Sequence, residues 1–236
     1  MDIRMPDRTA PVVSATLLLG GQLLAIVITQ FHPGGVANDH PAVFAAYAGS
    51  GTWTAVHLGQ FVATSILIGG LVAFCFALDG RAAPQRWAAR LGAGAAVVAL
   101  ALYGVVMAVD GVALKQAVNA WASAPAAEKP ARFAGAEAIR WIEWGARSYE
   151  NLALALALLL IAVAAARTAW VPRPVPYLMG LAGLIHVVQG WVAGAHGFPP
   201  AHDVAIVAAW VVNLVWMGWL AVGARAAHRT SGKPLS

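Results

Sequence analysis

The fold is decided by the stretch EWGARSYENLALALALLLIAVAAA, residues 143–166, in which three charged residues occupy the first third and apolar residues fill most of the remainder. A bilayer core about 30 Å thick needs about 20 mostly apolar residues per helix. The stretch therefore predicts a membrane helix. Charged side chains beside hydrocarbon are costly unless they are paired or hydrated, so their position also predicts a functional polar site at one end of that helix.

Similar apolar runs recur along the whole chain. Of its 236 residues, 60% are hydrophobic and 11% are charged, whereas a soluble domain carries about 25% charged residues. The sequence predicts an all-α, polytopic membrane protein that forms a single transmembrane domain over residues 1–236. Its six membrane helices are predicted over residues 12–29, 53–77, 91–109, 144–166, 177–195 and 204–222. The first is expected to be an uncleaved helix, because no small-x-small cleavage pattern leads into a soluble domain.

Basic residues are distributed unevenly between the connecting segments. Arginine or lysine precedes the first helix, occupies the second and fourth loops and follows the last helix, whereas the first and fifth loops contain neither. The positive-inside rule then places both termini in the cytoplasm and the odd-numbered loops outside. Abundant arginine and alanine indicate a bacterial source, so the expected location is the bacterial plasma (inner) membrane. The net charge of +5 forms no patch, so the expected partner is the lipid bilayer and not nucleic acid. An oligomer is compatible with the sequence.

The third loop is more than a connector. Residues 112–122 keep a helical period, Pro125 interrupts it, and residues 126–143 are helical again by pattern. Helices three and four are therefore predicted to continue beyond the membrane as an extended outer hairpin. The charges of this hairpin, among them Lys115, Glu137 and Arg140, are expected to be partly hydrated. Trp53, near a predicted helix end, is expected in an interfacial aromatic belt.

Three charged residues share one face of the fourth predicted helix. Glu143, Arg147 and Glu150 are spaced by four and three residues, which places the arginine between two carboxylates. Such a triad is almost neutral, which lets a membrane interior accept it. It could dock helix four to helix three through Asp110 or Lys115, or it could form the polar wall of a ligand site or proton path.

Two histidines are each followed by a glutamine three residues later. His57 with Gln60 lies on the second predicted helix, and His186 with Gln189 lies on the fifth. Each helix is the middle one of a three-helix half, which suggests a 3+3 inverted repeat. We expect His57 and His186 to line one cavity, the alternative being that each bonds separately to a carbonyl or to its glutamine. The predicted ligand pocket comprises His57, Gln60, Asp110, Glu143, Arg147, Glu150, His186 and Gln189.

Histidine also raises the prospect of a metal ion or haem as cofactor, because a neutral imidazole ligates both. The candidate metal ligands on the helices are His57, His186 and His196. The usual paired-ligand spacings, His-x-x-x-His and Glu-x-x-His, do not occur in the sequence. A second candidate set is expected to be exposed in the outer loops, where ordinary loop polarity is the alternative explanation: His32, Asp39, His40, His202 and Asp203.

Four segments carry a resemblance to known sequences: HPGGVANDHPAVFAAYAGSGTWTAVHLGQ, DGVALKQAVNAWA, EAIRWIEWGARSYENL and QGWVAGAHGFPPAHD. Between His32 and about Asn213 the chain resembles a group of uncharacterised bacterial integral membrane proteins with six predicted helices. The resemblance implies the fold and the location. The group has no assigned activity, so it implies no site residues.

Motifs that identify common membrane enzymes are missing from the sequence. It contains no nucleotide-binding glycine loop, no Gly-x-Ser-x-Gly elbow, no Asp-x-x-Asp motif and no zincin motif. Three functions remain open. The first is an outward-facing polar pocket that binds a metal, a haem or a small amphipathic ligand, with or without catalysis. The second is a proton-coupled transporter of small solutes, built from inverted halves and working through Glu150 or His186. The third is a non-catalytic membrane scaffold.

Overall fold

The computed structural model describes residues 9–78 and 82–230, with side chains up to residue 225. All regular secondary structure in these ranges is helical, which confirms the predicted all-α class. The elements are α1 (Thr9–Thr29), α2 (His40–Gly49), α3 (Trp53–Ala77), α4 (Ala83–Ala108), the π-helical segment η1 (Val109–Leu114), α5 (Lys115–Ala122), α6 (Lys129–Ala165), α7 (Pro174–His196) and α8 (Pro200–Thr230).

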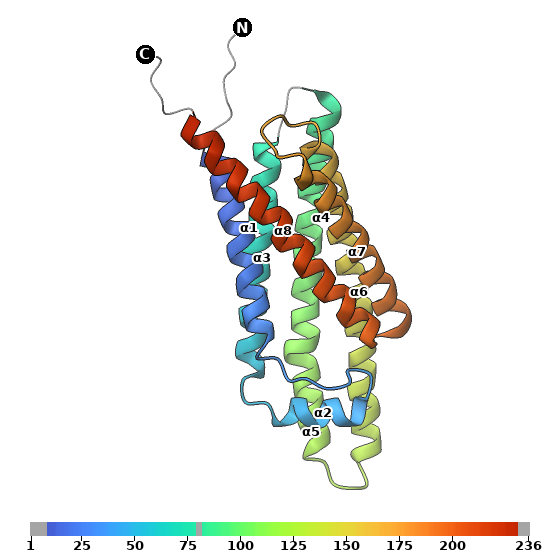
Figure 1. Ribbon diagram of the computed structural model, residues 1–236. Coiled ribbons are helices and arrows are strands. Elements are labelled where there is room, and N and C mark those ends of the chain that lie inside the picture. Colours follow the sequence, from blue (N-terminus) through green and yellow to red (C-terminus); the bar gives the residue numbers. More distant parts are fainter. Residues whose placement is uncertain (1–8, 79–81, 231–236) are drawn as a thin grey trace, which may run out of the picture.

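Six helical stretches are long and apolar enough to cross a membrane, which confirms the predicted multi-pass protein. Two of them extend, as predicted, well beyond their apolar runs at residues 91–109 and 144–166. The third runs through α4, η1 and α5 over Ala83–Ala122, and the fourth is Lys129–Ala165. Charged residues at helical spacing continue both stretches beyond the apolar runs. Together they form the predicted extended hairpin, whose tip lies at the end of the bundle where α2 also lies (Figure 1).

The membrane helices form a closed ring. Each packs against the next in the order α1, α3, α4, α6, α7 and α8, and α8 returns to contact α1. The start of α1 and the end of α8 lie at one end of the bundle, where the α6–α7 connection also lies (Figure 1). At the opposite end, α2 lies beside α5 and the turn into α6. We call this the α2 end.

Glycines bring two helix pairs into close contact. A Cβ atom at Gly21 of α1 would lie 2.9 Å from the carbonyl oxygen of Ala63 in α3. A Cβ atom at Gly190 of α7 would lie 2.9 Å from the carbonyl oxygen of Ser148 in α6. Small residues that allow backbones to approach are characteristic of membrane helix interfaces. These are corresponding pairs in the two proposed halves, although the inverted repeat itself stays a prediction.

The short helix α2 was not expected, and polar side chains fix both of its ends. The Asp39 carboxylate accepts a hydrogen bond of 3.3 Å from the backbone amide of Ala42 at the N-terminus. At the other end, Lys115 Nζ donates to the carbonyl oxygens of Tyr47, Ala48 and Ser50 at 2.6, 3.0 and 3.0 Å. A lysine placed there satisfies carbonyls that the helix leaves unpaired.

Trp53 corrects a second expectation. Its side chain is only 1% exposed and does not belong to an interfacial belt. The indole Nε1 donates to the carbonyl oxygens of Asp110 and Gly111 in η1, at 3.3 and 3.1 Å. Trp53 packs in an apolar cluster with Phe44 and Leu114. This cluster joins α2, α3 and η1 at the α2 end.

Candidate functional site

A cavity of about 490 Å³ lies inside the ring of helices. Of the predicted pocket residues, all except His57 line it: Gln60, Asp110, Glu143, Arg147, Glu150, His186 and Gln189. Its wall also includes His32 and Tyr47 near the α2 end, and His202 at the start of α8. The cavity is of the size that proteins use for small-molecule ligands, about 300–1,000 Å³.

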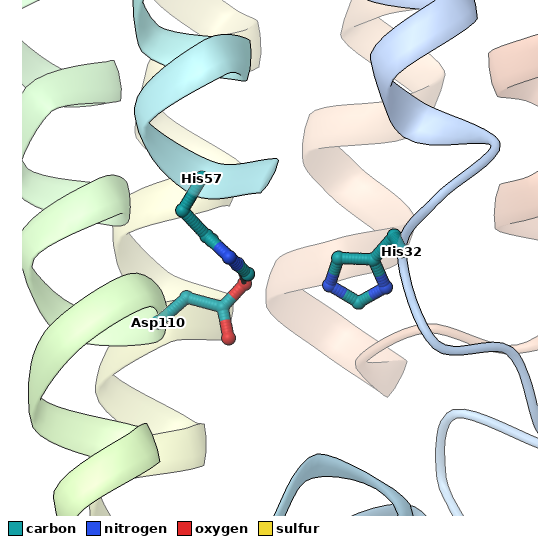
Figure 2. A group of neighbouring side chains, drawn as sticks. All are labelled: His32, His57 and Asp110. Carbon is teal, nitrogen blue, oxygen red and sulfur yellow. Dashed lines mark hydrogen bonds and ion pairs between the residues drawn. The ribbon is translucent and has the colours of Figure 1, made fainter. Parts of the chain in front are cut away.

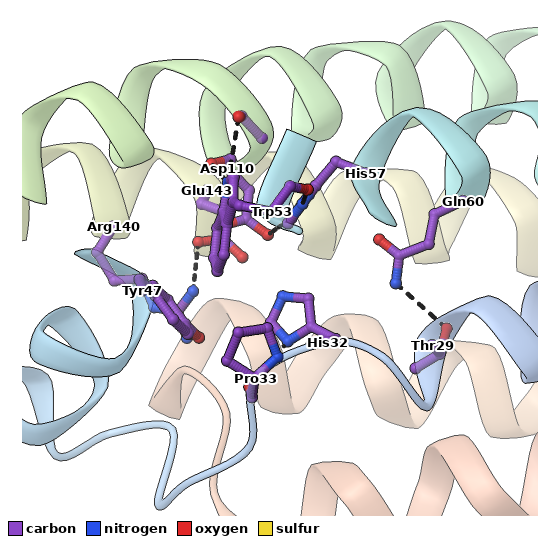
Figure 3. Close-up of polar contacts among 11 residues, drawn as sticks. Thr29, His32, Pro33, Tyr47, Trp53, His57, Gln60, Asp110, Arg140 and Glu143 are labelled. Carbon is purple, nitrogen blue, oxygen red and sulfur yellow. Dashed lines mark hydrogen bonds and ion pairs between the residues drawn. The ribbon is translucent and has the colours of Figure 1, made fainter. Parts of the chain in front are cut away.

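His57 lies behind the cavity wall and bonds to one of its members. Its Nε2 lies 3.0 Å from Oδ2 of Asp110, and its Nδ1 lies 2.8 Å from the carbonyl oxygen of Trp53 (Figure 3). A carbonyl oxygen only accepts, so Nδ1 carries a hydrogen and donates it. Nε2 then either donates to an Asp110 carboxylate or accepts from the protonated acid. In both forms the pair shares one proton and has no net charge.

The backbone of η1 explains how this pair forms. In a π-helix the hydrogen bond reaches back five residues, and such single turns are frequent at functional sites. Gly111 follows Asp110 in this turn, and a Cβ atom there would lie only 2.9 Å from Cβ of His57. The missing side chain lets η1 approach α3 closely enough for Asp110 to reach His57. Sequence reasoning named both partners but missed the π-helix and the role of Gly111.

Arginine and glutamate form two pairs on α6. Arg140 Nη1 donates to Glu143 Oε2 at 2.6 Å, and Arg147 Nη1 lies 3.5 Å from Glu150 Oε2. Glu143, expected beside Arg147, therefore pairs with Arg140. The Arg140 side chain, expected in a hydrated hairpin, is only 3% exposed and lies over the rings of Tyr47 and Phe198. Both guanidinium groups line the cavity already neutralised by a carboxylate.

His186 has a defined tautomer. The Asn151 amide nitrogen donates to the carbonyl oxygen of Arg147 at 3.0 Å, which turns Asn151 Oδ1 toward His186. His186 Nδ1 lies 2.8 Å from that oxygen and donates to it. The lone pair of a neutral imidazole is then on Nε2, which is buried and has no hydrogen-bond partner among the described residues. His186 therefore offers a hydrogen-bond acceptor.

The glutamines do not bond to the histidines, which was one alternative to a shared cavity. Gln60 donates to Thr29 Oγ1 at 3.2 Å, and Gln189 donates to the carbonyl oxygen of Ala205 at 3.2 Å. Each glutamine instead joins its helix to a neighbouring one. A further interhelical bond joins α8 to α1, where Asn213 donates to Gln22 at 3.4 Å.

Several polar atoms in the cavity wall have no hydrogen-bond partner in the part of the chain that the structure describes. They are buried atoms on residues from η1, α6, α7 and α8: Asp110 Oδ1, Arg140 Nε, His186 Nε2 and His202 Nε2. Leaving such an atom unsatisfied costs about 1–3 kcal/mol, so native proteins usually pair it. Four of them around one cavity indicate that the cavity suits a polar ligand group.

Two ionisable groups of the α2 end lie outside the membrane-spanning stretches. Burial lowers the pKa of His32, although the nearby carboxylate of Asp110 opposes this effect. Burial raises the pKa of the Tyr47 phenol, and the Arg140 guanidinium partly offsets the rise. Both groups are therefore held in their uncharged forms near neutral pH, which suits a cavity wall with few free charges.

The predicted metal sets need correction. His57, His186 and His196 form no ligand cluster among the described residues, and His196 is exposed. In the loop set, His40 and His202 are buried and not exposed as expected. His40 contacts Glu137 at 2.9 Å. His40 and His202 therefore pack into the protein and are not part of an exposed loop site.

Comparison of the chain with models of protein families, with curated proteins and with solved structures finds no match. The resemblance to bacterial six-helix membrane proteins accordingly stays an expectation. The function of the chain must therefore be inferred from the cavity and the side chains around it.

Proposed function

We propose that this protein binds one small amphipathic molecule in the central cavity, with the polar head of the molecule toward the α2 end. The observation that carries the proposal is the graded lining of the cavity. On α6 the residues lining it change from charged to apolar along the helix: Arg140, Glu143, Arg147, Glu150, Asn151, Leu154 and Leu158. From Arg140 to Leu158 this lining extends over about 27 Å of helix at 1.5 Å per residue.

The helix α3 supports the same direction. It starts at the α2 end, and its cavity-facing residues again change from polar to apolar: Gln60, Thr64, Leu67, Ile68 and Leu71. Two helices from opposite halves of the chain thus place polar groups at one depth and apolar groups deeper in the bundle. An elongated molecule with a polar head and an apolar tail matches both ends of such a cavity.

The charged residues of the cavity wall restrict the kinds of head group that can bind. Arg140 is paired with Glu143, and Arg147 is paired with Glu150. The His57–Asp110 pair is also neutral overall. Asp203 also lines the cavity but is exposed to solvent, so a net charge on the head group would meet no buried, unpaired counter-charge. The favoured head is therefore uncharged or zwitterionic and rich in hydrogen-bonding groups.

The direction of access follows from the position of the polar end. The cavity is lined at the α2 end by the segment that follows α1, including His32 and Ala37, and by Phe198 before α8. By the positive-inside rule this end faces outward from the bacterial plasma membrane. The ligand would then come from the outer leaflet or from the space outside the cell.

Filling the cavity tests this proposal. Leu154 lines the cavity, whereas Leu156 on the same helix is 53% exposed on the outer surface of the bundle. The probe is tritiated monodecanoylglycerol, an uncharged amphiphile, titrated against the full chain in phosphatidylcholine nanodiscs. We expect saturable binding to the wild type and to Leu156→Trp, and at least a tenfold loss in Leu154→Trp. Absent saturable binding, or equal binding by the two variants, would contradict the proposal.

A further inference from the structure

Three potential metal ligands converge beside the polar end of the cavity. One ligand atom from each of His32, His57 and Asp110 lies within 4.8 Å of the other two. His57 comes from α3, Asp110 from η1 and His32 from the segment after α1, so three separate elements meet here. Figure 2 shows the ring of His32 facing the His57–Asp110 pair across a gap.

Both imidazoles are oriented in the same way. His57 Nδ1 donates to the carbonyl oxygen of Trp53 at 2.8 Å, and His32 Nδ1 donates to that of Pro33 at 3.0 Å. Each histidine is thus left with Nε2 as its available ligand atom. Metal-binding histidines almost always hold their second nitrogen in such a bond, which fixes the tautomer and the ring orientation.

The carboxylate completes the set. His57 Nε2 and Asp110 Oδ2 are 3.0 Å apart, slightly closer than the roughly 3.4 Å between neighbouring ligand atoms of a tetrahedral metal with bonds of about 2.1 Å, so a small shift would admit the ion. Asp110 Oδ1 is buried and has no hydrogen-bond partner among the described residues. A simple ion pair would leave this oxygen unused, whereas a carboxylate that binds a metal can use either oxygen.

We propose that His32, His57 and Asp110 bind a divalent transition-metal ion such as Zn²⁺ and leave one coordination position open toward the cavity. Three protein ligands with an open fourth position are typical of reactive zinc sites, whereas structural sites have four. His32 and Asp110 line the cavity, so the open position would face its polar end. The ion takes the place of the proton between His57 and Asp110, so the site gains one net positive charge, which a hydroxide at the open position would balance. The inference goes beyond the proposed amphiphile binding, and either can fail without the other.

Metal reloading tests the inference directly. The full chain in nanodiscs is stripped with chelator and dialysed, and its binding of Zn²⁺ is measured by competition with a chromogenic chelator and by elemental analysis. We expect one zinc ion per chain in the wild type. Asp110→Asn keeps an oxygen that can accept from His57 but loses the charge, and His32→Gln loses the imidazole. Each should weaken zinc binding by more than the roughly 10–100-fold that outer-shell changes cost.

A matched control comes from the same cavity. His202 is also a buried histidine of the wall but lies outside the cluster, so His202→Gln should bind zinc as the wild type does. Zinc K-edge absorption of the wild type should show two imidazoles with oxygen ligands. Three outcomes would overturn the inference: a wild type that takes up no stoichiometric zinc, unchanged binding in Asp110→Asn, or a spectrum with a sulfur ligand.

Discussion

Lys115 shows how one residue can hold the α2 end together. Its ammonium group makes three hydrogen bonds to carbonyl oxygens at the C-terminus of α2. Tyr47, in the last turn of α2, contacts the cavity and lies under the guanidinium of Arg140. Removing the Lys115 ammonium group would therefore disturb the cavity wall as well as α2, because Tyr47 belongs to both. Lys115, expected to be a partly hydrated charge of the hairpin, thus acts as a helix cap.

Replacing Lys115 with methionine should lower the free energy of unfolding by about 1–3 kcal/mol, because hydrogen bonds from a charged donor are lost and carbonyls are left unpaired. Reversible unfolding in mixed detergent micelles measures the change. Lys129→Met is the matched control, because Lys129 makes one exposed hydrogen bond of 3.3 Å to the carbonyl oxygen of Ala122 and otherwise only lies over the Trp121 ring at 5.4 Å. Its effect should stay within about 0.5 kcal/mol. Equal losses in the two variants would refute the capping role.

For single residues, the sequence predicted which polar side chains lie inside the bundle, but it did not predict how they pair. Helical spacing allows Glu143 to reach Arg140 or Arg147, since both lie within four residues on one face. The choice depends on Tyr47 and Phe198, which enclose Arg140 and come from distant segments. His32 could not be placed beside His57 from the sequence, because its position depends on the path of a loop.

Among the elements, the contact between α6 and α7 depends on residues that lack side chains. Gly183 and Gly190 both face α6 at distances that leave no room for a Cβ atom. Ser148 adds a hydrogen bond of 2.7 Å from its hydroxyl group to the carbonyl oxygen of Gly190. This close pair carries Glu150 and Asn151 on one side and His186 on the other, so its packing positions the cavity wall.

Gly190→Ala should destabilise the protein by about 1–3 kcal/mol, because the new methyl group would lie 2.9 Å from the carbonyl oxygen of Ser148. Gly180→Ala, on the same helix, would meet only the Cβ atom of Ala162 at 4.0 Å. It should be neutral or stabilising by up to about 1 kcal/mol, as alanine favours a helix over glycine. Thermal unfolding of the two variants side by side measures the difference. A stability order opposite to this would show that the two helices are not closely packed at Gly190.

Helices were predicted correctly where the apolar stretches are long, and were missed where the helix is short. All six membrane stretches were expected, because about 20 apolar residues leave few alternatives. The helix α2 was missed because only ten residues form it, although Asp39 and the proline after His40 are start signals for a helix. The π-turn at Asp110 has no recognisable sequence pattern, since it differs from an α-helix only in hydrogen bonding.

For the molecule as a whole, the orientation in the membrane decides which solution meets the polar end. The exposed Ala126 lies between α5 and α6 at the α2 end, and the exposed Ala169 lies between α6 and α7 at the other end. With a cysteine at one position at a time, an impermeant maleimide should label Ala126→Cys in intact cells. It should label Ala169→Cys only after permeabilisation. The native Cys75 is buried and serves as the background. The reverse labelling pattern would place the cavity on the cytoplasmic side.

The order of the helices in the ring could not be predicted from the sequence. Six membrane helices can be arranged in many orders, and hydropathy does not distinguish them. The contact of α8 with α1, which includes the bond between Asn213 and Gln22, completes the ring of helices around the cavity. The predicted pocket residues come from four of the membrane-crossing stretches, and all except His57 meet at one cavity because of this order.

Native mass spectrometry of the full chain, released gently from its own membrane, tests the central claim most directly. The wild type should carry one small amphipathic molecule, which extraction and fragmentation would identify. Leu156→Trp should carry the same molecule, and Leu154→Trp should lack it because the indole fills the apolar part of the cavity. A wild type without a bound molecule, or a Leu154→Trp variant that carries as much as the wild type, would contradict the account.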